Sequence, residues 1–315
     1  MEDKLYKILS IDGGGIKGVF PASFLTSIEE SVGGKICEHF DLIVGTSTGG
    51  IIALALGAGI SSKEILEFYE KDGPNIFKGT KLLRFFRHLG ISKYDNAALK
   101  KALETKFGDK KLGDSCCRLV IPSLNLENGE VYVYKTAHNP RFERDYKVKM
   151  VDVALATSAA PTYFPTHRSA AGLPLIDGGV WANNPMGVAV VEALGPLGWQ
   201  KGEFKILSIG CTQEPLKIKA ARKLALGLGY WSLKIVDAMM AGQSSFSLGT
   251  AQWLAGHENV FRVNPVVSNG KYKIDLVKEI SSLKGMGDFE ARKALPSIRH
   301  FFDTKSEPFE PSHKL

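Results

Sequence analysis

Cysteine is scarce in this chain, with four residues among 315. Cys37 and Cys211 are isolated, whereas Cys116 and Cys117 are adjacent. Neither arrangement has the spacing of a disulfide framework, a zinc site or a redox pair. We therefore expect thiols buried in the core, a reducing compartment and no bound metal.

Long hydrophobic runs are also few. The longest stretch without a charged side chain, residues 42–62, has the length of a membrane span, but glycine and serine residues interrupt it. The first four residues, MEDK, are mostly charged and run directly into a predicted strand, so they lack the pattern of a signal peptide. These features predict a cytoplasmic protein without a membrane-spanning helix.

Positive charge is concentrated in one part of the chain. Residues 71–111 contain 11 Lys or Arg and 4 Asp or Glu, which accounts for the formal net charge of +7. Within this region, residues 81–89 (KLLRFFRHL) interleave aromatic and basic side chains. Such a segment can dock on an anionic lipid surface, and the alternative is a helix that buries Phe85 and Phe86. The whole basic region, residues 71–111, could equally bind an anionic nucleotide. We expect no nucleic-acid polymer as a partner.

The rest of the sequence alternates predicted strands with predicted helices. This pattern predicts an α/β fold with a mostly parallel central sheet that is covered by helices on both sides. Because 44% of the residues are hydrophobic and no repeat or linker divides the chain, residues 1–315 are expected to form one domain. After about residue 215 the pattern is mainly helical up to about residue 302, with a turn at residues 285–288 before a last helix from about residue 289 to residue 302. Met239 and Phe246 in this part could line an acyl pocket, a subunit interface of a homo-oligomer, or the core.

Ser47 lies in a G-x-S-x-G sequence, between Gly45 and Gly49. An apolar run, residues 42–44, precedes it, and a helical pattern follows. In a nucleophile elbow the flanking glycines let the backbone bend sharply, which places the serine oxygen at the N-terminus of the next helix. The alternative is an ordinary tight turn of small residues.

A glycine cluster follows the first predicted strand, residues 5–11. Residues 12–18 have the sequence DGGGIKG, and a helical pattern follows them to about residue 31. Consecutive glycines leave main-chain N–H groups open to an anion. Two kinds of site fit this feature: a cradle for a dinucleotide phosphate, because the spacing matches G-x-G-x-x-G, and an oxyanion hole for acyl transfer.

The second strand favours acyl transfer. A dinucleotide site needs an acidic residue at the end of this strand, about 20 residues after the glycines, whereas the strand leads into Ser47. A P-loop needs Ser or Thr after its lysine, and Lys17 is followed by Gly18. We therefore interpret the glycine cluster as an oxyanion hole.

Asp177 is the candidate base. It follows a short apolar strand, residues 173–176, and precedes Gly178 and Gly179. Active-site groups of open α/β sheets collect beyond the carboxyl ends of strands, so we expect Asp177 at the same edge of the sheet as Ser47. The alternative is an Asp-Gly turn that is stabilised by its own side chain.

Together, these segments resemble the three signature blocks of the patatin-like phospholipases, in the order of that family: residues 12–18 (DGGGIKG), 45–49 (GTSTG) and 177–179 (DGG). Residues 157–164 (TSAAPTYF) and 183–185 (NNP) resemble the segments on either side of the family's aspartate. The similarity covers about residues 5–210. It implies a three-layer fold and hydrolysis of fatty acyl esters of membrane phospholipids, with no cofactor.

The resemblance also implies a role for each matching residue. Ser47 would be the nucleophile and Asp177 its general base, which is a dyad in place of a triad. The oxyanion hole would consist of the main-chain N–H groups of Gly13, Gly14, Gly15 and Thr48. The supporting motif residues would be Asp12, Lys17, Gly18, Gly45, Gly49, Gly178 and Gly179.

Two other classes of protein stay open at this point. In an esterase of the Ser-His-Asp type, a histidine after Asp177 would complete a triad, and the candidates are His257, His300 and His313. A storage or binding protein could keep the fold without catalysis, but it would not need a nucleophile, a base and a glycine cluster together.

Some bacterial members of the family are similar to effectors of antiphage signalling, which degrade membrane phospholipid after a cyclic dinucleotide binds. The compact chain is compatible with such an effector. We therefore consider a cyclic dinucleotide as a candidate activator, and peripheral contact with the membrane as the mode of action.

Overall fold

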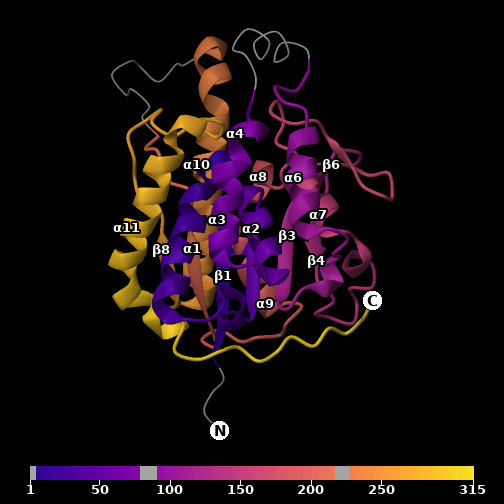
Figure 1. Ribbon diagram of the computed structural model, residues 1–315, viewed down its shortest axis with the longest axis vertical. Coiled ribbons are helices and arrows are strands. Elements are labelled where there is room, and N and C mark those ends of the chain that lie inside the picture. The colour runs from indigo at the N-terminus through magenta and orange to yellow at the C-terminus, as the bar shows by residue number, and fades with distance from the viewer. Residues whose placement is uncertain (1–4, 79–90, 217–226) are drawn as a thin grey trace.

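The computed structural model describes residues 5–78, 91–216 and 227–315, so the basic segment at residues 81–89 lies outside the described residues. Within these described residues the sheet has eight strands, seven of them in the order β5-β6-β3-β2-β1-β7-β8, and β4 pairs with β3 beside this path (Figure 1). The strands are β1 (Tyr6–Ile11), β2 (Leu42–Gly45), β3 (Arg118–Asn125), β4 (Val131–Lys135), β5 (His167–Arg168), β6 (Pro174–Asp177), β7 (Phe204–Ile209) and β8 (Val260–Val263).

The centre of the sheet is parallel. β3, β2, β1, β7 and β8 pair with one another in parallel, whereas β4, β5 and β6 pair in the antiparallel sense. Side chains alternate between two cores, with Leu9 and Ile11 of β1 on one face and Ile8 on the other. Because both faces are covered, the central strands β1 and β7 are buried along almost their whole length and consist mainly of apolar residues. The predicted mostly parallel sheet is confirmed.

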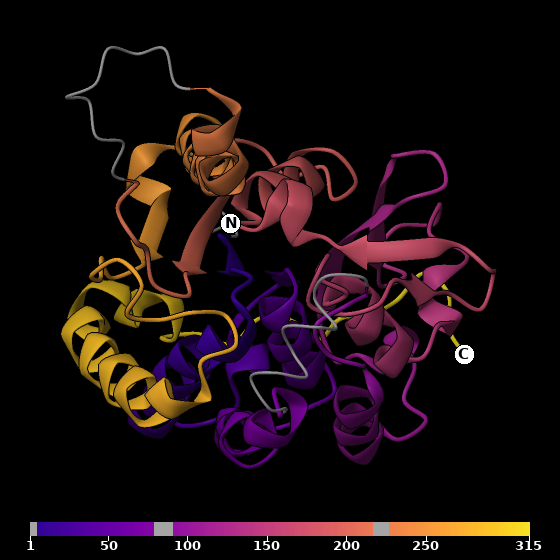
Figure 2. The same ribbon diagram turned by 90° about the horizontal axis from the view of Figure 1, so that it is seen from above.

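Helices cover both faces of the sheet, which confirms the expected three-layer arrangement (Figure 2). The helices on one face are α1 (Val19–Val32), α2 (Thr48–Gly57), α3 (Ser62–Lys71), α6 (Ala97–Phe107), α7 (Met150–Thr157) and α11 (Ile280–Ile298). Those on the other face are α9 (Met186–Leu194) and α10 (Leu228–Ala255). Two short helices are α4 (Gly73–Ile76), which follows α3, and α8 (Gly179–Ala182), which begins two residues after Asp177.

The last long helix begins earlier than the sequence predicts. Its glycines indicate a turn at residues 285–288 and a helix from about residue 289, whereas α11 begins at Ile280. α11 packs along α1, and a Cβ on Gly287 would lie 2.6 Å from the carbonyl oxygen of Phe20. The glycine therefore allows two helices to approach closely and does not mark a turn.

All four cysteines are free thiols. Cys37, Cys117 and Cys211 are buried as expected, but Cys116 is exposed, because β3 begins only at Arg118 and Cys116 lies in the turn before it. Among the described residues, no helix is both long enough and apolar enough to cross a membrane.

Candidate active site

Ser47 lies in a strained turn between β2 and α2. Its backbone has φ 56° and ψ −122°, a conformation that residues other than glycine rarely adopt. A Cβ on Gly45 would lie 2.1 Å from the carbonyl oxygen of Gly49, and a Cβ on Gly49 would lie 2.2 Å from that of Ile11. Only glycine fits at these two positions, so the flanking glycines are what makes the turn possible. The predicted strand–turn–helix is present.

The Ser47 hydroxyl donates a hydrogen bond to Asp177. The distance from Ser47 Oγ to Asp177 Oδ2 is 2.6 Å, and both residues are buried. The other carboxylate oxygen, Oδ1, accepts a hydrogen bond from the main-chain N–H of Gly179 at 2.6 Å. Ser47 is also held by its own main-chain N–H, which donates to Thr157 Oγ1 at 3.0 Å. The two predicted catalytic side chains are thus in direct contact.

Burial raises the pKa of Asp177 to about 6. The hydrogen bonds from the Ser47 hydroxyl and the Gly179 amide act in the opposite direction, because they stabilise the carboxylate. A carboxylate with this pKa is mostly ionised at neutral pH and is a stronger base than an exposed aspartate. Its environment therefore suits a general base.

Asp177 reaches the site from an antiparallel strand. The sequence predicts that Asp177 lies at the same edge of the sheet as Ser47, and the structure places both residues there. However, β3 extends beyond β2, and its last residues pair with β6 in the opposite direction, with Ser123 opposite Asp177. A Cβ on Gly178 would lie 2.3 Å from the Pro122 carbonyl oxygen, so this glycine lets β6 pass close to β3.

The glycine loop after β1 lies against Ser47. A Cβ on Gly13 would lie 3.2 Å from the Cβ of Ser47. Gly13 and Asn183 form two hydrogen bonds: the Gly13 N–H donates to the Asn183 carbonyl oxygen at 2.9 Å, and Asn183 Nδ2 donates to the Gly13 carbonyl oxygen at 3.3 Å. The Gly13 amide, which the resemblance places in the oxyanion hole, therefore holds this loop to the segment after Asp177.

Three other main-chain amides remain as donors for an oxyanion. Among the residues that the structure describes, the N–H groups of Gly14, Gly15 and Thr48 have no hydrogen-bond acceptor. Gly15 adopts a φ of 59°, which favours glycine. Gly18 allows the loop to pack on α2, because a Cβ there would lie 2.2 Å from Thr48 Oγ1. The oxyanion hole stays a prediction, and it now depends on these three amides.

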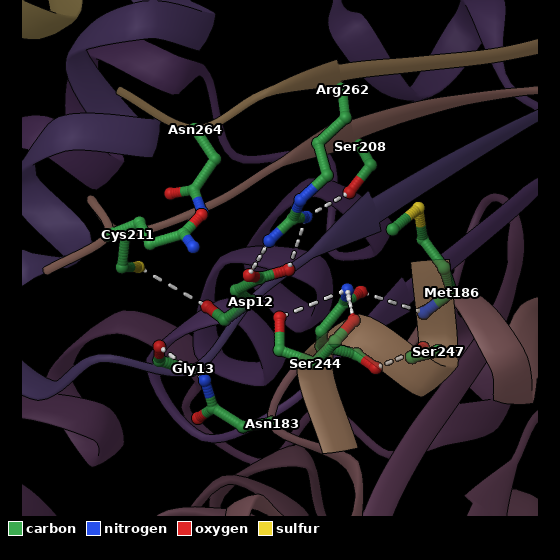
Figure 3. A network of polar contacts seen from close by, with 12 residues as sticks. Asp12, Gly13, Asn183, Met186, Ser208, Cys211, Ser244, Ser247, Arg262 and Asn264 are labelled. Carbon is green, nitrogen blue, oxygen red and sulfur yellow. Dashed lines mark hydrogen bonds and ion pairs between the residues drawn. The ribbon is translucent and has the colours of Figure 1, made fainter. Parts of the chain in front are cut away.

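A buried ion pair fixes the start of the glycine loop (Figure 3). Arg262 of β8 binds both carboxylate oxygens of Asp12, with Nη1 at 3.1 Å from Oδ1 and Nη2 at 2.6 Å from Oδ2. Nη1 also donates to Ser208 Oγ at 2.6 Å, and the Cys211 thiol donates to the Asp12 carbonyl oxygen at 3.4 Å. Lys17 forms no side-chain hydrogen bond or ion pair with a described residue. Arg262 could not be found from the sequence, because a single arginine in a short strand has no motif spacing.

No histidine of the described residues completes a triad. His257 is exposed, the ring of His300 packs against Phe261, and His313 binds a main-chain carbonyl oxygen. None of them contacts Asp177. The described residues also contain no group of three His, Cys, Asp or Glu side chains that could hold a metal ion.

Known proteins match this chain over most of its length. The family model described as patatin-like phospholipase matches residues 9–190. A cGAMP-activated phospholipase of Pseudomonas aeruginosa (strain BWHPSA011 / Pa011) is 35% identical over 302 residues, which cover 92% of this chain and 89% of the relative. A cGAMP-activated phospholipase of Vibrio cholerae serotype O1 is 34% identical, with 81% and 79% covered, and patatin-like protein 2 of Oryza sativa subsp. indica is 30% identical, with 73% and 67% covered. Because the family match includes more than half of the residues and all three signature blocks, this chain belongs to the patatin-like phospholipase family.

Proposed function

We propose that this protein is a lipid acyl hydrolase that cleaves fatty acyl esters of membrane phospholipids, with Ser47 as nucleophile and Asp177 as general base. The observation that supports it most directly is the buried hydrogen bond of 2.6 Å between Ser47 Oγ and Asp177 Oδ2. Membership of the family supports the choice of substrate. A storage or binding protein would not need this pair together with the glycine loop.

The reaction would proceed through an acyl-enzyme. The Ser47 oxygen attacks the carbonyl carbon of the ester while its proton passes to Asp177 Oδ2. Negative charge on the carbonyl oxygen would be stabilised by the N–H groups of Gly14, Gly15 and Thr48, near the N-terminus of α2. The proton then moves from Asp177 to the leaving lysophospholipid oxygen. Asp177 then takes a proton from a water molecule, which attacks the acyl-enzyme. As the Ser47–acyl bond breaks and the fatty acid leaves, Asp177 returns this proton to the Ser47 oxygen.

A cyclic dinucleotide is the proposed activator. The relatives from Pseudomonas aeruginosa and Vibrio cholerae, and one from Escherichia coli that is 30% identical over 344 residues, are all named cGAMP-activated phospholipases. The basic region at residues 71–111 is a candidate for binding this anion, and its residues 79–90 lie outside the described residues. Its charge suits a phosphodiester as well as an anionic lipid surface.

Peripheral contact with the bilayer would bring the enzyme to its substrate. Met239, Phe246 and Trp253 of α10 are 62%, 75% and 74% exposed. They recur every seven residues and therefore lie along one side of the helix. We expect the double variant Phe246→Ser/Trp253→Ser to bind phospholipid vesicles more weakly than the wild-type protein in a flotation assay. Equal binding by the two proteins would exclude α10 as a membrane contact.

Release of fatty acid from phospholipid vesicles, measured with and without cGAMP, tests the proposed function. We expect release by the wild-type protein in the presence of cGAMP, and a loss of several orders of magnitude in Ser47→Ala and in Asp177→Ala, because the two residues act as a unit. Ser245→Ala, on the exposed surface of α10, is the control and should behave as wild type. Hydrolysis that persists in Ser47→Ala would refute the mechanism, and hydrolysis independent of cGAMP would refute the activator.

A further inference from the structure

The segment that follows Asp177 is held by α10, a helix from the last third of the chain. Gln243 uses both ends of its side-chain amide: Nε2 donates to the Gly179 carbonyl oxygen at 2.8 Å, and Oε1 accepts a hydrogen bond from the Asn183 N–H at 2.7 Å. Gly179 is the first residue of α8, and Asn183 directly follows its last residue. Gln243 therefore spans this short helix from end to end.

The hydrogen bond to Gly179 leads directly to the catalytic carboxylate. Gly179, whose carbonyl oxygen binds Gln243, donates its own N–H to Asp177 Oδ1 at 2.6 Å. Gly179 has no side chain to anchor it, and a Cβ there would lie 2.9 Å from Asp177 Oδ1. Its position is therefore fixed by hydrogen bonds to its own main chain, one of which comes from the Gln243 side chain.

The Asp177 carboxylate has few other partners. Apart from Gly179, it binds the Ser47 hydroxyl, and no charged side chain of the described residues contacts it. A displacement of Gly179 would consequently change both the orientation of the carboxylate and its affinity for a proton.

The second hydrogen bond of Gln243 supports the glycine loop. Asn183, which Gln243 binds through the main-chain N–H, accepts a hydrogen bond from the Gly13 N–H and donates one from Nδ2 to the Gly13 carbonyl oxygen. One amide side chain is therefore linked to the carboxylate through Gly179 and to the predicted oxyanion loop through Asn183.

We propose that Gln243 is a positioning residue for hydrolysis: it fixes both ends of α8 and, through Gly179, orients the Asp177 carboxylate towards Ser47. The inference rests on the proposed function of this site. A neutral amide suits the role, because it donates and accepts at the same time without placing a charge beside a buried carboxylate.

The variant Gln243→Met tests the proposal, because methionine has a similar length and helix propensity but forms neither hydrogen bond. We expect kcat to fall about 10-fold with KM nearly unchanged, since of the two lost hydrogen bonds the one to Gly179 orients the carboxylate, and a single hydrogen bond changes a rate by roughly that factor. Loosening of the Gly179 hydrogen bond raises the pKa of Asp177, so the acid limb of kcat/KM should move to higher pH. Rates are measured from about pH 5 to about pH 9 with 4-nitrophenyl butyrate in the presence of cGAMP.

Ser247→Ala is the matched control. Ser247 lies one turn further along α10 and holds the next segment, because its hydroxyl donates to the Asn184 carbonyl oxygen at 2.6 Å and accepts from the Gly187 N–H at 2.8 Å. This variant should lose stability but keep the wild-type pH profile. If both variants lose activity equally and neither shifts the acid limb, α10 only packs against the site and the proposal is overturned.

Hydrogen exchange separates a failure of this inference from a failure of the proposed function. Main-chain amides in peptides that contain residues 178–183 should exchange faster in Gln243→Met than in the wild-type and Ser247→Ala proteins, as measured by mass spectrometry. This measurement needs no substrate, so it decides on Gln243 even if the wild-type protein hydrolyses no ester. Unchanged exchange together with an unchanged pH profile would overturn the positioning role.

Discussion

Asp177 has to be ionised to act as a base, yet it is only 5% exposed to solvent. Burial raises its pKa to about 6, although two hydrogen bonds stabilise the carboxylate. A group with a higher pKa in the folded than in the unfolded state binds its proton more tightly in the folded state. Its contribution to stability is therefore complete below the unfolded pKa of about 3.9 and is lost as the pH rises through about 6.

Asp177→Asn should stabilise the fold at neutral pH, because the amide has no proton to lose. It can keep the Gly179 hydrogen bond through its oxygen and donate to Ser47 through its nitrogen. The shift from about 3.9 to about 6 corresponds to about 3 kcal/mol of unfolding free energy above pH 6. Urea unfolding at about pH 4 and about pH 8 measures the effect, and the gain over wild type should be larger at the higher pH. A variant less stable than wild type at about pH 8 would contradict this account.

The same pKa predicts the pH dependence of the wild-type enzyme. Because only the ionised Asp177 can accept the Ser47 proton, kcat/KM should increase with pH through about 6 and then level off. Ester hydrolysis measured across this range tests the prediction. A rate that is constant between about pH 4 and about pH 8 would exclude Asp177 as the base.

At the scale of elements, two glycines of α11 differ in what lies opposite them. A Cβ on Gly287 would lie 2.6 Å from the Phe20 carbonyl oxygen in α1, whereas a Cβ on Gly285 would meet open space. We expect Gly287→Ala to destabilise the protein by about 1–3 kcal/mol, because α11 must move away from α1. Gly285→Ala should be stabilising by up to about 1 kcal/mol, because alanine favours a helix. Thermal unfolding compares the pair, and equal effects would refute close packing at Gly287.

Elements with a local pattern could be predicted from the sequence, and elements that depend on distant contacts could not. The first strand and helix and the turn at Ser47 follow from hydrophobic period and turn glycines. The direction of β6 depends on how far β3 extends beyond β2, which no local pattern records. A glycine such as Gly287 has the same signature in a turn and in a close helix contact. Gln243 and Arg262 bind partners far away along the chain, so no spacing identifies them.

At the scale of the whole molecule, the first and last thirds of the chain are joined inside the fold. Asp12 and Arg262 are 250 positions apart, and their side chains are 6% and 12% exposed. The pair connects β8, near the edge of the sheet, to the loop after the central strand β1. The C-terminal third therefore belongs to the same core as the signature blocks.

Arg262→Met should destabilise the protein by about 3–5 kcal/mol, because it leaves the Asp12 carboxylate buried without a partner. The double variant Asp12→Asn/Arg262→Met should recover part of this loss, since it also removes the unpaired charge. Urea unfolding of the two single variants and the double variant measures the coupling between the residues. Strict additivity of the two effects would mean that the ion pair contributes nothing to the fold.

The distance along the chain between the groups that meet around Ser47 also matters while the protein is being synthesised. Asp177 leaves the ribosome 130 positions after Ser47, and Arg262 leaves it 250 positions after Asp12. A truncated product that ends before β6 contains the hydroxyl without its carboxylate, and one that ends before α10 lacks the support of Gln243. The proposed catalytic centre is therefore complete only after α10 has been synthesised.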